Sequence, residues 1–296
     1  TAALGLLFSW NYDQDGLLID EILEKGPLDI AARKTRPGCI LEAINGEKIL
    51  ARQDYFPLLN KQAGKITLLS LYDPAGGERW EEIIKPISLS AQNELLYNRW
   101  VKQREADVEK YSAGRLGYVH IRSMADPSFR SIYSDILGKF NQKEGIVIDT
   151  RFNGGGRLHE DLEILFSGHS YFTQVIRDEL SCDMPSRRWN KPSIMLVGEA
   201  NYSNAHGSPW VYKHTGIGKL VGMPVPGTMT SVSWETLQDP SLLFGIPVVG
   251  YRLPDGSYLE NQQLEPDFKI ANDPRHIVPG EDQQLEKAVE ELLKQL

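Results

Sequence analysis

The chain has 296 residues, of which 41% are hydrophobic and 24% are charged, as in an ordinary globular protein. A chain of this length predicts about two domains. Its 32 Lys and Arg residues against 40 Asp and Glu residues give a net charge of −8, which argues against nucleic acid or an anionic membrane surface as a partner. The apolar runs are no longer than short strands, so the sequence predicts no membrane span.

The two cysteines, Cys39 and Cys182, lie far apart and fit no metal-binding or redox spacing. We interpret both as small buried side chains, because the sequence offers no support for a disulfide. The sequence begins at Thr1 without an initiator Met and shows no signal peptide, which we interpret as a fragment or a processed form. Cytoplasmic, periplasmic and secreted locations therefore all stay open.

Residues 1–89 are predicted to form a small β-rich domain. Leu17–Ile22 and Lys65–Leu71 have the composition of strands. Asn45-Gly46 lies between apolar flanks and predicts a hairpin turn.

Two motifs in this region resemble those of PDZ domains. Pro37–Glu47 leads from a turn into a strand that ends in Ile-Asn-Gly, and Leu4-Gly5-Leu6 is similar to the loop that holds a peptide C-terminus. The resemblance implies that a peptide adds a strand to this domain and that the backbone of Leu4, Gly5 and Leu6 receives its carboxylate. The alternative is a small β domain without a peptide ligand.

Residues 90–114 are predicted to form a connecting helix, and residues 115–296 an α/β domain. Apolar residues from Ala91 to Lys110 fall roughly on one helical face, and Ser112-Ala113-Gly114 ends the pattern. Strands then alternate with helices, as in an α/β domain with a largely buried sheet. We expect strands at Leu116–Ile121, Ile146–Ile148, Ile194–Val197 and Lys219–Val221, and helices at Phe129–Phe140, Leu158–Phe166, from about Ala205, and at Asp282–Leu296.

The stretch from Gly145 to Gly156 is the most distinctive of the chain. A short apolar run predicts a strand buried on both faces, and the three glycines after Asn153 allow the backbone to turn sharply and to approach a ligand. Their N–H groups, followed by a helix start near Arg157, are suited to binding negative charge. A tight turn without a ligand is equally consistent with the glycines alone.

A second candidate segment, Gly198–Gly207, also follows a buried strand and precedes a helix, so we expect both strand ends to meet at one edge of the sheet. The start of such a helix is where α/β hydrolases expose a nucleophile, and we place this position at Ala205. Alanine has no nucleophilic atom. Ser203 and Ser208 flank it, but Ser203 is predicted to precede the turn and Ser208 to lie before Pro209 within the helix.

Four motifs occur in the order found in one peptidase family: Arg99–Val101, Gly117–Ile121, Asp149–Gly156 and Asn201–Gly207. Together with the PDZ-like start, they resemble the C-terminal half of tricorn-type proteases, relatives of the C-terminal-processing serine peptidases. The resemblance covers nearly the whole chain. It implies a crotonase/Clp-like β-β-α core in the α/β domain.

The resemblance also implies roles for single residues. A catalytic Ser is expected where this sequence has Ala205, Gly156 and His206 are implied to donate backbone N–H groups to the oxyanion, and Glu260 is implied to act through a Ser–His pair that precedes the PDZ domain. That histidine lies upstream of residue 1. Since a serine needs a base to lose its proton, we expect the chain as given to be inactive.

The implied substrate is a peptide or an unfolded protein segment, and the family also implies a homo-oligomer. Two alternatives stay open: a peptide-binding scaffold without catalysis, and an acyl-thioester enzyme of the crotonase type, which the PDZ-like start and Glu260-Asn261 disfavour. We expect the His206 side chain to point away from position 205. No metal or cofactor is expected, because the other histidines show no metal-binding spacing: His120, His159, His169, His214 and His276.

Overall fold

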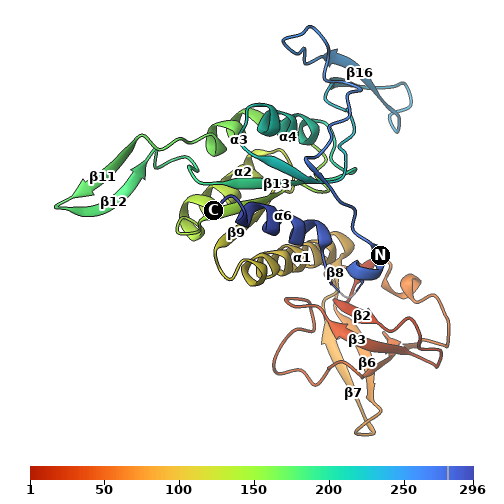
Figure 1. Cartoon of the computed structure of the whole chain (residues 1–296). Helices are drawn as coiled ribbons and strands as arrows, with labels where there is room; N and C mark the ends of the chain where they lie inside the picture. Colours follow the sequence, from red (N-terminus) through yellow and green to blue (C-terminus); the bar gives the residue numbers. More distant parts are fainter. Residues whose placement is uncertain (279) are drawn as a thin grey trace. The chain divides into compact units, whose positions relative to one another are not determined.

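The computed structural model describes residues 1–278 and 280–296, which form two compact units, Thr1–Lys102 and Gln103–Leu296. Helix α1 (Leu89–Tyr111) begins in the first unit and ends in the second (Figure 1). The secondary structure is mixed α/β, and each unit has its own hydrophobic core.

The first unit is an antiparallel sheet in the order β2-β3-β4-β6-β7, with β5 paired to β4 and a separate β1–β8 pair. The predicted hairpin at Asn45-Gly46 is confirmed, since both residues adopt positive φ (51° and 82°) between β4 and β5. The predicted strand Leu17–Ile22 is confirmed as β3, and the second predicted strand forms as β6. The elements are β1 (Ala2–Ala3), β2 (Leu6–Phe8), β3 (Leu17–Ile22), β4 (Ile40–Ile44), β5 (Glu47–Lys48), η1 (Phe56–Leu59), β6 (Thr67–Asp73), β7 (Glu78–Ile84) and β8 (Ile87–Ser88).

The second unit is built on a parallel sheet in the order β17-β14-β13-β10-β9. Every residue of the central strands β10 and β13 is buried, as the continuous apolar runs predict. The strands are β9 (Leu116–His120), β10 (Gly145–Asp149), β13 (Ser193–Val197), β14 (Lys219–Gly222) and β17 (Phe268–Lys269).

Helices cover both faces of this sheet. Helix α6 packs on β10, β13 and β14, whereas α3 and α4 pack on one another on the other face (Figure 1). The predicted helices are confirmed, although the one expected from Phe129 begins earlier and ends in a π-helical turn. The elements are α2 (Asp126–Ser134), the turn η2 (Asp135–Lys139), α3 (His159–Phe166), α4 (Asn204–His214), α5 (Pro274–Ile277) and α6 (Gln283–Leu293).

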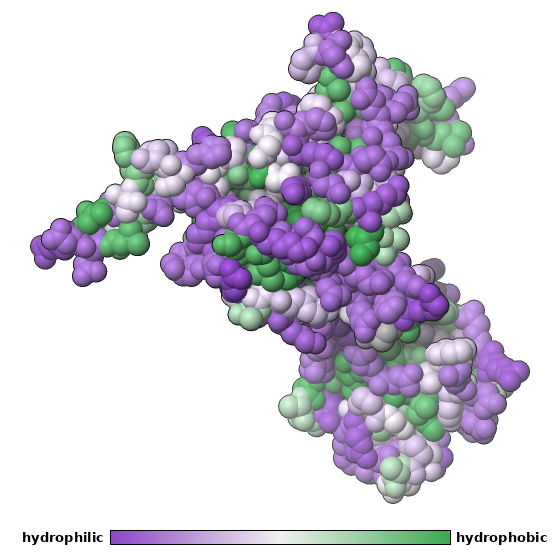
Figure 2. Space-filling model, viewed as in Figure 1, coloured by the Kyte–Doolittle hydropathy of each residue, from purple (hydrophilic) through white to green (hydrophobic). Residues whose placement is uncertain are grey.

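Two hairpin ribbons were not expected from the sequence: β11 (Phe172–Ile176) with β12 (Glu179–Met184), and β15 (Ser231–Thr236) with β16 (Leu243–Val249). Each projects from the body of the second unit (Figure 1). Both carry exposed apolar side chains, among them Phe172, Leu180, Trp234 and Phe244, and Figure 2 shows apolar surface on both.

None of the described helices is long and apolar enough to cross a membrane. Both cysteines are free thiols. Cys39 is buried, as predicted, but the same prediction is wrong for Cys182, which lies half-exposed in the β12 ribbon.

Candidate active site

Two loops meet at the carboxyl edge of the parallel sheet, one after β10 and one after β13. These strands are neighbours, with Asp149 opposite Leu196. The Tyr202 N–H donates to the Asn153 carbonyl at 3.0 Å, and the Asn201 side-chain amide donates to Thr150 Oγ1 at 2.9 Å. The expected convergence of the two strand ends is therefore confirmed.

A buried charge network holds the first loop. The Arg151 guanidinium donates to Asp149 and, at 2.9 and 3.0 Å, to Asp282 at the start of α6. Burial alone would lower the pKa of Arg151, but the two carboxylates outweigh it and hold that pKa above its usual value. Burial alone would raise the pKa of Asp282, but Arg151 keeps it below its ordinary range. The network thus ties the end of β10 to the last helix.

The last two glycines of the loop lie where a side chain would not fit. Gly155 (φ 98°) packs against the second loop, and a β-carbon there would lie 2.6 Å from Ser203 Cβ and 2.7 Å from the Tyr202 carbonyl oxygen. At Gly156 (φ 137°), a β-carbon would lie 2.0 Å from the Met124 carbonyl oxygen. Both positions therefore require glycine, whereas Gly154 faces open space.

Ser203 lies at the turn from β13 into α4 and has a strained backbone, with φ 55° and ψ −123°. Its N–H donates to Thr228 Oγ1 at 3.0 Å, and its side chain makes no capping hydrogen bond to α4. The residue is half-buried. A strained strand-to-helix turn of this kind is what presents a serine hydroxyl at the edge of a sheet.

Ala205 lies one step further along, inside the first turn of α4. It is fully buried in the core, and its N–H donates to the Tyr202 carbonyl. The His206 N–H donates to the Ser203 carbonyl at 2.8 Å, so it is engaged in the same helical turn. By contrast, the N–H groups of Gly156 and Asn204 have no acceptor among the described residues.

Glu260 lies beside the start of α4. Its Oε2 accepts from the Thr230 N–H at 2.7 Å, and its charge acts on the His206 imidazole. That ring is fully buried, and neither ring nitrogen has a hydrogen-bond partner among the described atoms. Burial lowers the pKa of His206, and Glu260 and the backbone of Gln262 offset this effect only in part. The structure therefore places Glu260 near His206, and the sequence analysis did not predict this proximity.

In the first unit, the loop that the sequence analysis expects to bind a peptide contacts helix α1 of the same unit. Leu4 and Leu6 are buried, and the Gly5 N–H donates to the Gln92 side-chain oxygen at 3.2 Å. Gln92 and Leu89 also line a cavity of only about 40 Å³ between β2 and η1. The backbone group expected to receive a carboxylate thus already has an acceptor.

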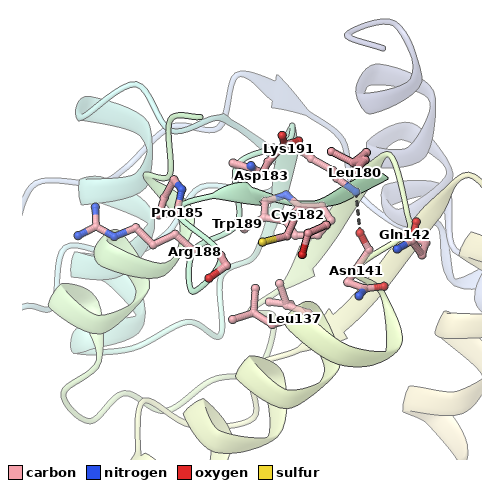
Figure 3. Close-up of a pocket in the computed structure, with 14 residues that line it drawn as sticks. Leu137, Asn141, Gln142, Leu180, Cys182, Asp183, Pro185, Arg188, Trp189 and Lys191 are labelled. Carbon is pink, nitrogen blue, oxygen red and sulfur yellow. Dashed lines mark hydrogen bonds between the residues drawn. The ribbon is translucent and has the colours of Figure 1, made fainter. Parts of the chain in front are cut away.

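A larger cavity, of about 380 Å³, opens at the base of the β11–β12 ribbon (Figure 3). Its lining includes Asn141 and Lys191, which precede β10 and β13, so it lies at the sheet edge opposite to Ser203. Lys191 Nζ donates to the Asn141 carbonyl at 2.6 Å, and burial lowers its pKa. Among the described residues, no three His, Cys, Asp or Glu side chains are grouped to hold a metal ion.

Residues 115–270 match the family described as peptidase family S41. The chain is 27% identical over 270 residues to Tricorn protease homolog 1 of Streptomyces coelicolor, and 24% identical over 261 residues to Tricorn protease of Thermoplasma acidophilum. These alignments cover 90% and 88% of this chain but only 25% and 24% of the relatives, so the chain spans about a quarter of their length. A crystal structure of the tricorn protease shares the fold, with a TM-score of 0.82, 22% identity, and coverage of 99% of this chain and 29% of the other.

Proposed function

The chain belongs to peptidase family S41, and from this membership we propose that it cleaves peptides or unstructured protein segments as a serine endopeptidase through an acyl-enzyme. We propose a PDZ-like fold for residues 1–89, a connecting helix over 90–114, and a crotonase/Clp-like core for residues 115–296. The observation that carries the proposal is the strained backbone of Ser203 at the meeting point of the two loops.

We place the nucleophile at Ser203 and no longer at Ala205. Ala205 lies in the core, so a hydroxyl on its β-carbon would be directed into packed side chains. Ser203 is half-buried at the helix start, and its side chain is not used as a cap. The expectation of inactivity rested in part on the missing hydroxyl at position 205, and this reason no longer applies.

The change of nucleophile also changes which N–H groups are assigned to the oxyanion hole. In this register the residue after the nucleophile is Asn204, and its N–H replaces that of His206 as the second donor beside Gly156. Each donor aimed at the developing oxyanion contributes about 3 kcal/mol to transition-state stabilisation. The N-terminal end of α4 adds a favourable dipole at the same point.

The reaction follows from these groups. Ser203 Oγ attacks the peptide carbonyl carbon as its proton passes to a base, and the N–H groups of Gly156 and Asn204 stabilise the tetrahedral oxyanion. Collapse expels the amine, which takes up the proton, and water then hydrolyses the acyl-enzyme. Two exposed aromatic side chains, Phe152 and Tyr202, stand on the two loops and supply apolar contact for a substrate.

The family resemblance supplies the base from a histidine that precedes the first unit, with Glu260 acting through it. We keep this assignment because His206 is enclosed and makes no hydrogen bond to Ser203. We therefore expect Ser203 to react with serine-directed reagents, and to turn over substrate, when the chain is tested together with the upstream segment that carries this histidine.

A fluorophosphonate probe tests the nucleophile. We expect the chain joined to the upstream segment to be labelled on Ser203 and the Ser203→Ala variant of the same protein not to be labelled. Ser170→Ala removes an exposed serine outside the site and should keep the label, and Ala205→Ser should add no second labelled site. Labelling that survives in Ser203→Ala would refute the assignment.

The second candidate is a peptide-binding scaffold without catalysis. It is favoured by one observation: within the described residues, the Ser203 hydroxyl has no hydrogen-bond partner that could serve as its base. Binding of unstructured peptide without any labelling of Ser203, with the upstream segment present, would decide for the scaffold.

We also propose that copies of the chain assemble. The exposed apolar side chains of the β11–β12 and β15–β16 ribbons support this, because apolar two-stranded ribbons are poorly stable when uncovered. Sedimentation of the intact chain over a range of concentrations tests it, and a monomer at all concentrations would contradict it.

A further inference from the structure

The side chain of Asn204 joins the two loops of the candidate active site. Its Oδ1 accepts from the Leu158 N–H at 2.8 Å and from the His159 N–H at 3.2 Å. Its Nδ2 donates to His159 Nδ1 at 2.8 Å. Asn204 is 2% exposed, so these bonds are shielded from competing water. A single amide thereby uses both of its ends on the same short segment.

These contacts satisfy groups that α3 cannot satisfy itself. The first N–H groups of a helix have no partner within it, and a side chain just before the helix usually supplies one. Here the residue before α3 is Leu158, which has no side-chain acceptor. The cap comes instead from Asn204, at the start of α4. The starts of the two helices are therefore held together by one residue.

Leu158 lies two residues after Gly156, and Asn204 carries the second oxyanion donor on its own backbone. We propose that the Asn204 side chain, oriented by His159, is a positioning group that fixes the N–H groups of Gly156 and Asn204 relative to one another. This inference rests on the proposed function, since it assigns the two N–H groups to an oxyanion hole.

The backbone N–H groups of Leu158 and His159 face the amide oxygen of Asn204, so its NH₂ group is directed at the His159 ring. The ring Nδ1 accepts from Asn204, so the ring proton lies on Nε2. The ring stands edge-on to Tyr251, with centroids 6.2 Å apart. If the amide turned by 180°, its NH₂ group would face two N–H donors, and the hydrogen bonds that join Asn204 to Leu158 and His159 would be lost. A residue at 159 whose side chain accepts a hydrogen bond should therefore preserve this orientation of the Asn204 amide. A residue whose side chain cannot accept one should weaken the link between Asn204 and the start of α3.

The experiment compares a peptide boronate, which forms a tetrahedral adduct on a serine oxygen, with the corresponding peptide lacking boron. Asn204→Leu keeps the size of the side chain and removes its hydrogen bonds. We expect it to weaken boronate binding about 100-fold, the loss typical of a displaced oxyanion donor, and to leave peptide binding within about twofold. His159→Leu should weaken the boronate in the same way, and His159→Gln, whose oxygen can accept from Asn204, should restore most of the affinity.

Amide hydrogen exchange provides a second readout, because exchange at Leu158 and His159 should accelerate in Asn204→Leu. Equal boronate affinity in the unmodified chain, Asn204→Leu and His159→Leu would overturn the positioning role alone. Unchanged exchange at Leu158 would do the same. Absence of any adduct on the unmodified chain would overturn the proposed nucleophile and the positioning role with it.

Discussion

Gly155 and Ser203 meet so closely that a β-carbon on Gly155 would lie 2.6 Å from the Ser203 β-carbon. This contact joins the glycine loop after β10 to the turn after β13. It explains why no side chain fits at 155, where φ is 98°, and it places this glycine directly against the strained backbone of Ser203. The two distinctive segments of the sequence thus form one structural feature.

Replacing Gly155 with alanine should displace this turn. The substitution combines a φ of 98° with overlap against backbone and Cβ atoms, and we expect it to lower the free energy of unfolding by about 1–3 kcal/mol and to abolish labelling of Ser203. Gly154→Ala is the matched control, since a β-carbon there meets nothing within 4 Å. Thermal unfolding and probe labelling of both variants check the prediction, which fails if the two variants behave alike.

The alternation of strands and helices could be predicted because periodic burial sets it. The position of the nucleophile could not. It depends on where the turn after β13 ends and α4 begins, and the positive φ at Ser203 that marks this point lies against Gly155, a residue from another part of the chain. A sequence pattern alone therefore favoured Ala205, a residue that the first turn of α4 buries in the core.

The ribbons escaped prediction for a different reason. The β11–β12 turn uses Arg177 and Asp178 at positive φ, without the Asn-Gly or Asp-Gly pair that marks a hairpin. Both ribbons are largely exposed on both faces, so no alternation of buried and exposed residues marks their strands. The Gln92 contact to Gly5 was equally hidden, because it joins residues 87 positions apart.

Asp282→Asn should reveal the stabilising effect of the buried network. The substitution removes one of the two carboxylates that face the buried Arg151 and leaves Asp149 as the other, so we expect a loss of about 1.5–3 kcal/mol in the free energy of unfolding at neutral pH. The pKa of Asp282 is lowered in the folded chain, so its contribution is complete above the unfolded value of about 3.9 and is lost as the pH falls below it.

Denaturant unfolding between neutral pH and pH 3 measures this effect. The variant should be destabilised at neutral pH and should lose less stability than the unmodified chain below pH 4. Asp273→Asn, which breaks an exposed ion pair with Arg275, is the control and should change stability little. Equal stability of Asp282→Asn and the unmodified chain at neutral pH would contradict the prediction.

Gln92→Ala should open the loop of the first unit. Removal of the side-chain oxygen leaves the Gly5 N–H without its acceptor, so a peptide carboxylate can take its place. We expect a peptide with a free C-terminus to bind about five- to tenfold more tightly to the variant than to the unmodified chain, the effect of roughly one hydrogen bond. Calorimetric titration measures this. The same peptide amidated at its C-terminus should show no gain, and an equal gain for both peptides would exclude carboxylate recognition by this loop.

The buried imidazole of His206 should make stability depend on pH near neutrality. Burial lowers its pKa in the folded chain, so the unfolded chain binds the proton more readily. The free energy of unfolding is therefore highest above the unfolded value of about 6.5 and falls below it, by at most about 1.4 kcal/mol per pH unit for one group. His206→Gln, which stays neutral, should reduce this slope between pH 7 and 5.

His276→Gln is the control of opposite sign. The hydrogen bond to Glu281 raises the pKa of His276, so the stabilisation that this histidine contributes is present at low pH and is lost as the pH rises. Urea unfolding at each pH measures both variants. A slope that is unchanged in His206→Gln would show that the imidazole does not remain buried and neutral in the folded chain.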